Sequence, residues 1–251
     1  DWDNLIKKIL KFYEQVLRAW SMKDFNFSGL ETGHDHFFAT FYKFYVLAEN
    51  YYPELLVDVM KRAANQQEQY LEIMVMPQLF NRDKFPKASR PLTVKNFARR
   101  REELLANEQF KSAINYTITK IANDLAKARK ILGCENQPER KVCRLTIKFQ
   151  YYAFREQDLN KIFEELLLGF IVAQKSSDFV GVNLVGAEDS PIALRDYKKD
   201  MQIFQFLHQA YPNVAISLHA GELNPYKANH KDTGFHIQEA VHVAHAQRIG
   251  H

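Results

Sequence analysis

Long apolar runs are missing from this sequence. None reaches the roughly 20 residues that a membrane-spanning helix needs, so we expect no membrane partner. No signal peptide is visible either, although the chain does not begin with Met and a cleaved or trimmed amino end is compatible with that. The compartment stays open between the cytoplasm and an exported location, periplasmic or secreted.

Cysteine is also scarce. The chain has 2 cysteines, Cys134 and Cys143, which is too few for a disulfide framework. They flank a loop of residues 135–142, between an expected helix end and an expected strand start. A single disulfide is one interpretation, and two free buried thiols are the one that we favour.

A strong excess of charge of one sign is absent as well. The sequence has 34 Lys and Arg against 30 Asp and Glu, with a net charge of +4, so its total charge does not imply a nucleic-acid partner and we expect none. The 251 residues are 46% hydrophobic, which is enough for the core of one α/β domain. With no short repeat and no low-complexity linker, we expect a single domain over residues 1–251.

Hydrophobic periodicity predicts helices and strands that alternate from residue 70 on. The predicted helices cover residues 1–20, 54–69, 102–132, 159–173, 191–210 and 236–247, with an aromatic stretch at 37–47 and a long loop at 80–101. The predicted strands cover residues 70–76, 142–149, 179–185, 213–222 and 248–251. This order favours a parallel sheet with helices outside it.

The chemistry-bearing residues follow the strand at 213–222. His219 ends its alternating part, and Glu222 comes three residues later, after an Ala-Gly turn. A metal ligand beside a general acid is one interpretation of this pair, and a capped turn with a surface glutamate is the other. His251, which ends the last predicted strand, strengthens the first, because barrel enzymes collect catalytic groups at strand carboxyl ends.

Two motifs together resemble the adenosine deaminase family, and its growth-factor-related branch most of all. They are Ser217-Leu-His-Ala-Gly-Glu222 and Arg248-Ile-Gly-His251. Three further segments come in the order typical of the family and extend the resemblance over nearly the whole chain: His36-Phe-Phe-Ala-Thr-Phe41, Tyr70-Leu-Glu-Ile73 and Gly181-Val-Asn-Leu-Val-Gly-Ala-Glu-Asp189.

The resemblance implies a zinc hydrolase on a TIM-type (β/α)8 barrel that binds a purine nucleoside. His219 matches a zinc ligand, and Glu222 matches the acid that protonates the purine ring nitrogen. His251 matches the histidine that orients the zinc-bound water, and Gly186 matches a glycine whose backbone contacts the purine. The Pro-Cys-x-x-Cys signature of cytidine-type zinc deaminases is absent.

The sequence departs from the family pattern at both ends. The His-x-His of the family's first strand and the aspartate pair of its eighth strand are not found, so the barrel is expected to be incomplete, with strands 2 to 6 present. We expect these residues to be a partial barrel domain with extra N-terminal helices, from a longer protein that supplies the other zinc ligands. The isolated chain is then expected to bind no zinc tightly and to be inactive.

Other candidates have simpler interpretations. His34-Asp-His36 could replace the missing pair, but it lies in a polar link, and we favour an ordered loop or a helix cap. The run 99–101 could contact phosphate, and a solvated helix start is favoured. His242 and His245, one helical turn apart, could bind metal but more often mark a helix face.

Arg155 and Glu188 follow strand ends and could line a pocket mouth, lie on the surface or support such residues. The stripe Phe37, Phe38, Phe41 and Phe44 could be a ligand box, and a core or a subunit contact is favoured, which leaves a homodimer open.

We therefore expect hydrolytic deamination of adenosine or 2′-deoxyadenosine to the inosine product and ammonia. A relative acting on another aminopurine is one alternative. A catalytically silent nucleoside-binding or growth-factor-like protein on the same scaffold is the other.

Overall fold

The computed structural model describes residues 2–77, 82–223 and 233–250, apart from the side chains of Asp3 and Val46. The chain divides into two compact units, residues 1–55 and residues 56–251. His251 lies outside the described residues. Among the described residues, none of the helices combines the length and the apolar character that a membrane span requires.

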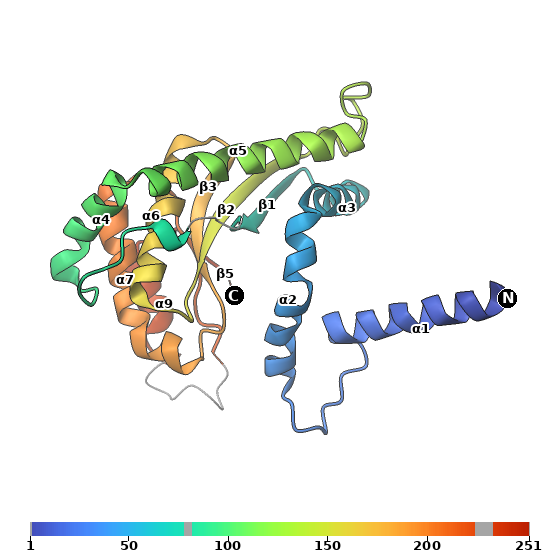
Figure 1. Ribbon diagram of the computed structural model, residues 1–251, viewed down its shortest axis with the longest axis horizontal. Coiled ribbons are helices and arrows are strands. Elements are labelled where there is room, and N and C mark those ends of the chain that lie inside the picture. The colour runs from blue at the N-terminus through green and yellow to red at the C-terminus, as the bar shows by residue number, and fades with distance from the viewer. Residues whose placement is uncertain (1, 78–81, 224–232, 251) are drawn as a thin grey trace. The chain divides into compact units, whose positions relative to one another are not determined.

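The first unit is helical and leaves much apolar surface exposed. It contains α1 (Trp2–Trp20), α2 (Gly33–Asn50) and the start of α3 (Tyr52–Asn65) (Figure 1). α1 begins and ends close to the predicted bounds, yet Ile9 and Phe12 are 58% and 67% exposed. The predicted aromatic stripe forms a chain of ring contacts along α2, with centroids 5.3–5.6 Å apart between Phe37, Phe41 and Phe44.

The second unit is built on two small parallel sheets. One has the order β1-β2-β3, formed by β1 (Tyr70–Val75), β2 (Thr146–Phe154) and β3 (Phe179–Val185). The other pairs β4 (Ser217–His219) with β5 (Arg248–Gly250). Tyr70 pairs with Thr146 at the start of the β1–β2 register, and the β2–β3 register shifts between Phe149 and Gln150.

The expected (β/α)8 barrel is wrong for this chain. The five predicted strands form in the predicted order and run parallel, but the described residues give sheets of three and two strands and no eight-stranded barrel. β3 and β4 are not paired as strands of one sheet, and an isolated bridge between Val182 and Ile216 joins the two sheets just before β4 begins. Five strands divided between two sheets cannot close an eight-stranded barrel.

Glycine allows the backbones to approach where the two sheets meet. A Cβ at position 181 would lie 2.8 Å from the backbone oxygen of Ala215, which is closer than real Cβ atoms come to backbone. The Val182 amide also donates to that oxygen, at 3.0 Å. Gly181 therefore permits the contact that places β4 beside β3.

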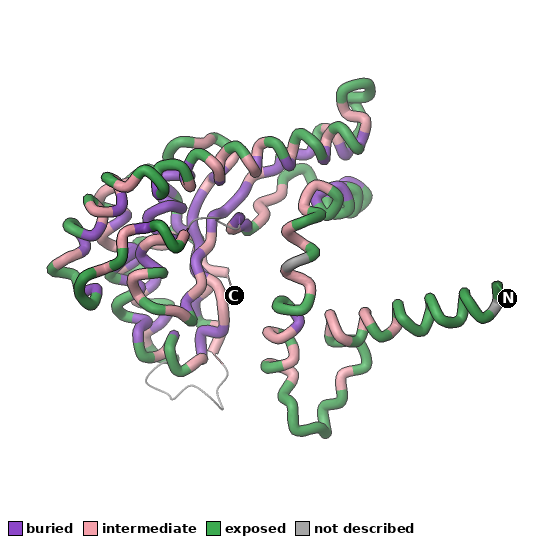
Figure 2. The backbone as a smooth tube through the Cα atoms, viewed as in Figure 1, coloured by how far each residue is buried: buried purple, intermediate pink, exposed green. Residues whose placement is uncertain are grey.

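Helices cover the first sheet. After β1, η1 (Arg82–Lys84) and η2 (Val94–Asn96) lead to α4 (Phe97–Ala106) and α5 (Glu108–Ile131), where one helix was predicted. Asn107 separates them because its side chain caps α5. α6 (Leu159–Lys175) packs on β2 and β3 between α5 and α7 (Pro191–Ala210), and α9 (His236–His242) contacts α7. Figure 2 shows that the buried residues gather on these strands and on the helix faces toward them.

The two cysteines form a disulfide, so the expectation of free thiols is wrong. α5 ends at Ile131, and Gly133, with φ of 72°, turns the chain as the predicted cap does. Arg129 then donates to the backbone oxygens of Cys143 and Leu145. These bonds hold residues 141–145 in turns, which is why β2 starts at Thr146 and not at Val142.

Candidate functional site

Three of the four predicted site residues lie at the carboxyl ends of neighbouring strands. His219 is the last residue of β4 and is half-buried, and Glu222 follows after the Ala-Gly turn. Gly186 directly follows β3 and has a φ of 102°, a backbone conformation that glycine adopts without strain. The buried and exposed positions of the 213–219 segment alternate as predicted, with Val214, Ile216 and Leu218 buried.

Asn183 on β3 fixes the imidazole of His219. Its side-chain oxygen accepts a hydrogen bond from the His219 backbone amide at 3.2 Å and lies 3.1 Å from His219 Nδ1. Because an amide oxygen can only accept, this geometry places the proton on Nδ1 and the lone pair on Nε2. A histidine that binds metal through one nitrogen typically has the other held in this way.

Asn183 belongs to a polar row that crosses the first sheet. The Asn183 side-chain nitrogen donates to Gln150 Oε1 at 3.2 Å, and Gln150 Nε2 donates to Glu72 Oε2 at 2.5 Å. Glu72 also accepts hydrogen bonds from Tyr70 and from Arg248 of β5. The row therefore links all the described strands on the face that carries His219.

The carboxyl group at the end of this row is held in its charged form. Burial raises the pKa of Glu72, but hydrogen bonds from Arg248, Gln150 and Tyr70 outweigh it and bring the pKa below its ordinary value. The row thus runs from a carboxylate on β1, through two amides, to the imidazole of His219.

Glu72, Gln150 and Asn183 were not predicted as site residues. Each is a polar residue inside an otherwise apolar strand, which is the signal that could have found them. Gln150 and Asn183 are buried, at 6% and 4% exposure. Buried amides need partners, so a polar residue in such a strand predicts a bonded network at the sheet.

Arg155 and Glu188 are buried beneath the site and do not lie on the surface. They are 1% and 0% exposed. Glu188 accepts hydrogen bonds from the backbone amides of Gly221 and Glu222, each at 3.0 Å. The loop after β3 is thereby joined to the turn that carries the predicted acid.

The described residues fit one ligand of a zinc site but not a whole one. A catalytic zinc ion normally has three protein ligands, and in the described part of the chain no three His, Cys, Asp or Glu side chains are grouped to hold a metal ion. His219, with its lone pair on Nε2, is suited to supply one ligand. The remaining ligands were expected outside this chain, and that stays a prediction.

The other predicted histidines have different environments. His36 lies in α2, where its Nδ1 is 3.1 Å from Glu31 Oε2 and its Nε2 is 3.0 Å from the backbone oxygen of Ser21. Both nitrogens thus order the loop before the helix. α9 ends at His242, so His245 lies beyond it and the expected shared helix face is wrong. The ring of His245 instead lies 5.0 Å from that of His208.

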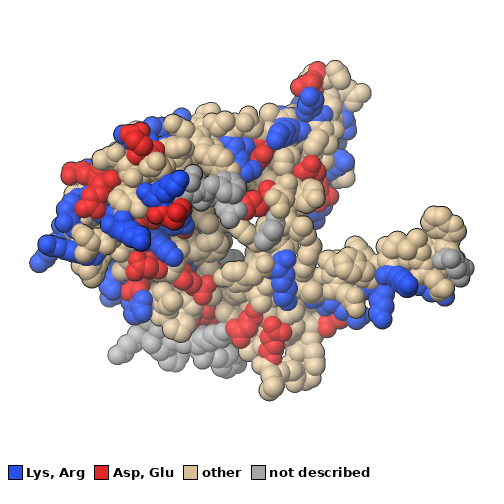
Figure 3. All heavy atoms as spheres, in the orientation of Figure 1, with Lys and Arg blue, Asp and Glu red and all other residues tan. Residues whose placement is uncertain are grey.

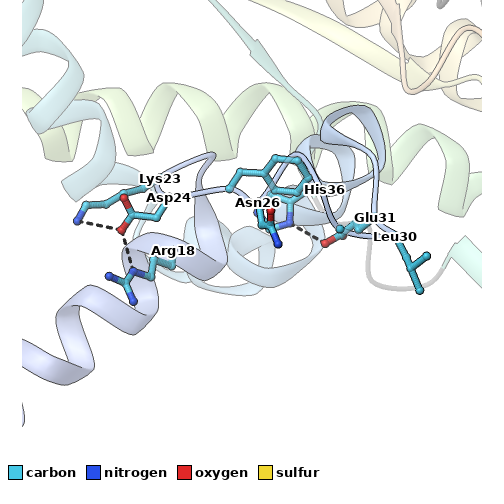
Figure 4. A pocket seen from close by; sticks show the side chains of 9 residues that line it. Arg18, Lys23, Asp24, Asn26, Leu30, Glu31 and His36 are labelled. Carbon is cyan, nitrogen blue, oxygen red and sulfur yellow. Dashed lines mark hydrogen bonds and ion pairs between the residues drawn. The ribbon is translucent and has the colours of Figure 1, made fainter.

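The loop before α2 and the end of α1 line an open surface pocket of about 290 Å³ in the first unit. Figure 4 shows that its charged side chains pair with one another. Asp24 accepts from Arg18 at 2.9 Å and lies 3.8 Å from Lys23, and Glu31 binds His36. These pairs order the loop, and nothing in them indicates a particular ligand.

The basic run 99–101 does not form one phosphate-binding surface. Arg99 is exposed, whereas Arg100 is buried and donates to Glu164 at 2.6 Å. Arg101 lies over the ring of Phe206, 5.5 Å from its centroid. Only the first of the three therefore fits the solvated helix start that was favoured. On the face that Figure 3 shows, positive and negative side chains are interspersed.

Comparisons with known proteins place this chain in no family. No protein-family model, no curated protein and no solved structure matches it. The resemblance to adenosine deaminases therefore stays a prediction that rests on the motifs and on the geometry of the strand ends.

Proposed function

We propose that the natural protein containing this chain is a zinc-dependent adenosine deaminase. The reaction is adenosine, or 2′-deoxyadenosine, plus water to the inosine product plus ammonia. The observation that carries the proposal is the position of His219 and Glu222 around one turn, beside Gly186, with the imidazole oriented through Nδ1.

Each residue has a distinct role in this proposal. His219 supplies one zinc ligand through Nε2. Glu222 donates a proton to the purine ring nitrogen, which makes the amino-bearing carbon more electrophilic. The backbone at Gly186 contacts the purine, and His251 orients the attacking water. When bound, zinc supplies hydroxide by lowering the pKa of a coordinated water to about 7.

A deamination assay on the full natural protein tests this proposal. We expect zinc-dependent loss of adenosine absorbance and one ammonia released per inosine formed. Glu222→Gln should lower kcat by about 10²–10⁴-fold, the usual contribution of a general acid. Wild-type protein that leaves adenosine unchanged with zinc present would reject the proposal. Rates on adenine, adenosine and AMP, measured side by side, separate it from a deaminase of another aminopurine.

A catalytically silent nucleoside-binding protein is the second candidate. The observation that favours it is that, in the described part of the chain, no three His, Cys, Asp or Glu side chains are grouped to form a catalytic metal site. Calorimetric titration with adenosine distinguishes the two. A silent protein binds the nucleoside equally well with and without a chelator and releases no ammonia.

The disulfide favours an exported protein within both candidates. Disulfides persist in oxidising compartments and are rare in the cytosol, so the Cys134–Cys143 bridge supports a periplasmic or secreted location. Alkylation of the protein isolated from its native compartment, followed by mass measurement, tests this. Two alkylated thiols without prior reduction would contradict it.

A further inference from the structure

The turn between His219 and Glu222 is held from below by one buried carboxylate. Glu188 Oε1 accepts from the Gly221 amide and Oε2 accepts from the Glu222 amide, each at 3.0 Å. Two oxygens of one side chain thus bind two consecutive backbone amides. Hydrogen bonds to a charged acceptor are about twice as strong as neutral ones, so this contact restricts the turn firmly.

Arg155 holds the residue before the turn. Its Nη2 donates to the backbone oxygen of His219 at 2.7 Å and to that of Leu184 at 3.0 Å. Its Nη1 lies 3.4 Å from Glu188 Oε2. The two buried side chains therefore form an ion pair whose remaining contacts reach the backbone at both ends of the His219–Glu222 turn.

His236 fixes the carboxylate from the other side. Its Nδ1 lies 2.6 Å from Glu188 Oε1, and the side chain is completely buried. The ring stacks on Tyr197 with centroids 3.6 Å apart and planes 9° from parallel, and the Tyr197 hydroxyl donates to the His236 backbone oxygen. Glu188 thus has little freedom, because α7 and α9 both fix its partner.

The turn needs such a support because its own backbone is unusual. Gly221 has a φ of 92°, and a Cβ there would lie 2.8 Å from Ile237 Cδ1. The Gly221 oxygen accepts from the Leu223 amide at 2.9 Å, and the amides of Gly221 and Glu222 donate to Glu188. Glu188 satisfies the amides at the point where the chain must aim the Glu222 side chain.

We propose that Glu188, held by Arg155 and His236, is a positioning residue that fixes the backbone of Gly221 and Glu222 and thereby aims the Glu222 carboxyl at the substrate. This inference rests on the proposed deaminase function for its effect on catalysis. Its effect on the turn itself does not depend on that function.

The test uses the full natural protein with zinc and the variant Glu188→Gln, which keeps the shape but replaces one acceptor oxygen with an NH₂ group. Glu164→Gln is the matched control, because Glu164 is also a largely buried carboxylate paired with an arginine, Arg100, and no bond from it reaches the turn. Two quantities are measured: kcat and KM for adenosine, and hydrogen exchange of peptides covering residues 219–223.

We expect Glu188→Gln to lower kcat by about 10–100-fold, because a misplaced catalytic group costs up to about 10²-fold, while KM changes by less than about threefold. Exchange of the Gly221 and Glu222 amides should accelerate about tenfold, the effect of losing one hydrogen bond. Glu164→Gln should leave both quantities within about threefold of wild type, even where it lowers the midpoint of unfolding.

Unchanged exchange in Glu188→Gln overturns the inference, and so does a fall in kcat that Glu164→Gln reproduces. Wild-type protein without turnover rejects the proposed function instead. In that case the exchange rates alone decide whether Glu188 positions the turn, and acceleration confined to Glu188→Gln supports it.

Discussion

Two buried carboxyl groups of this protein differ in their hydrogen-bond partners. Glu188 and Asp200 are 0% and 1% exposed, and the charge of Arg155 lowers the pKa of each. Glu188 has donors for both oxygens. Neither oxygen of Asp200 has a hydrogen-bond partner in the described part of the chain.

Their pKa values move in opposite directions. Burial raises the pKa of Glu188, but the hydrogen bond from His236, the charge of Arg155 and the Gly221 amide outweigh it, and the pKa falls below its ordinary value. Burial raises the pKa of Asp200 well above its ordinary value, and the charges of Arg155 and Lys199 do not offset it. Burial alone therefore does not set the charge state, and the local donors do.

Removing the hydrogen-bonded carboxylate of Glu188 should have the largest effect on the free energy of unfolding. Glu188→Ala leaves Arg155 buried beside a cavity and three donors without their acceptor, so we expect the free energy of unfolding to fall by about 3–5 kcal/mol. Urea unfolding followed by circular dichroism measures this change. A loss below about 1 kcal/mol would mean that the hydrogen bonds of Glu188 give it no advantage in stability over Asp200.

Reduction of the disulfide should cost less. Breaking the Cys134–Cys143 bond frees a loop with a sequence separation of 9, and chain entropy then predicts a loss of about 2–3 kcal/mol. Among the described residues, no hydrogen bond or ion pair joins the disulfide to Glu188 or Asp200, so reduction should cost the same stability in variants of either carboxyl group. Urea unfolding with and without a reductant checks this additivity.

Gly221→Ala should disrupt the contact between Glu188 and the turn without changing the Glu188 carboxylate itself. The substitution forces a side chain into a backbone with φ of 92° and against Ile237, at a cost of about 1–3 kcal/mol. The amide at 221 would then move away from Glu188. Unfolding measurements give the cost, and hydrogen exchange at residues 219–223 reports the movement; Gly133→Ala, also at positive φ but with open space around it, is the control.

The two carboxyl groups should produce opposite pH dependence. The stability that Glu188 contributes is present above pH 4.5 and is lost as the pH falls through its lower folded-state pKa, so Glu188→Gln should flatten the acid side of the stability curve. Asp200 acts in the other direction. Its folded-state pKa lies above 3.8, so stability falls as the pH rises from 3.8 through that value.

Asp200→Asn should therefore be the smallest and the only stabilising change. It removes the charge that burial disfavours, and each unit of pKa shift removed is equivalent to about 1.4 kcal/mol. We expect higher stability than wild type near pH 7 and little difference near pH 4, measured as urea midpoints at both values. Equal gains at both pH values would contradict the prediction, because they would mean that the folded-state pKa of Asp200 is not raised above its ordinary value.

The sequence predicted the elements better than their contacts. The predicted strand at 179–185 and the predicted helix at 191–210 have the bounds of β3 and α7, because apolar alternation and an N-terminal proline are local signals. β2 starts four residues later than predicted, since long-range bonds from Arg129 hold the preceding turns. The partial barrel that the resemblance implied depended on pairing between distant strands, which local patterns do not specify.

The candidate site was predictable only where the sequence places its residues close together. His219 and Glu222 share one turn, so their proximity followed from the chain itself. The contact of His219 with Asn183 depends on the register between β4 and β3, which the sequence does not reveal. Arg155 and Glu188 are completely buried, whereas charged residues are rarely so, and the sequence left open whether they line a pocket mouth, lie on the surface or support the site.

Gly181 limits the substitutions that this protein can accept between its two sheets. Since the Ala215 oxygen occupies the space that a Cβ would need, even alanine at position 181 would push the two sheets apart. Separation there would carry β4 away from Asn183, and the imidazole would lose the acceptor that sets its tautomer. A residue with no side chain and no chemistry of its own thus governs whether His219 can serve as a ligand.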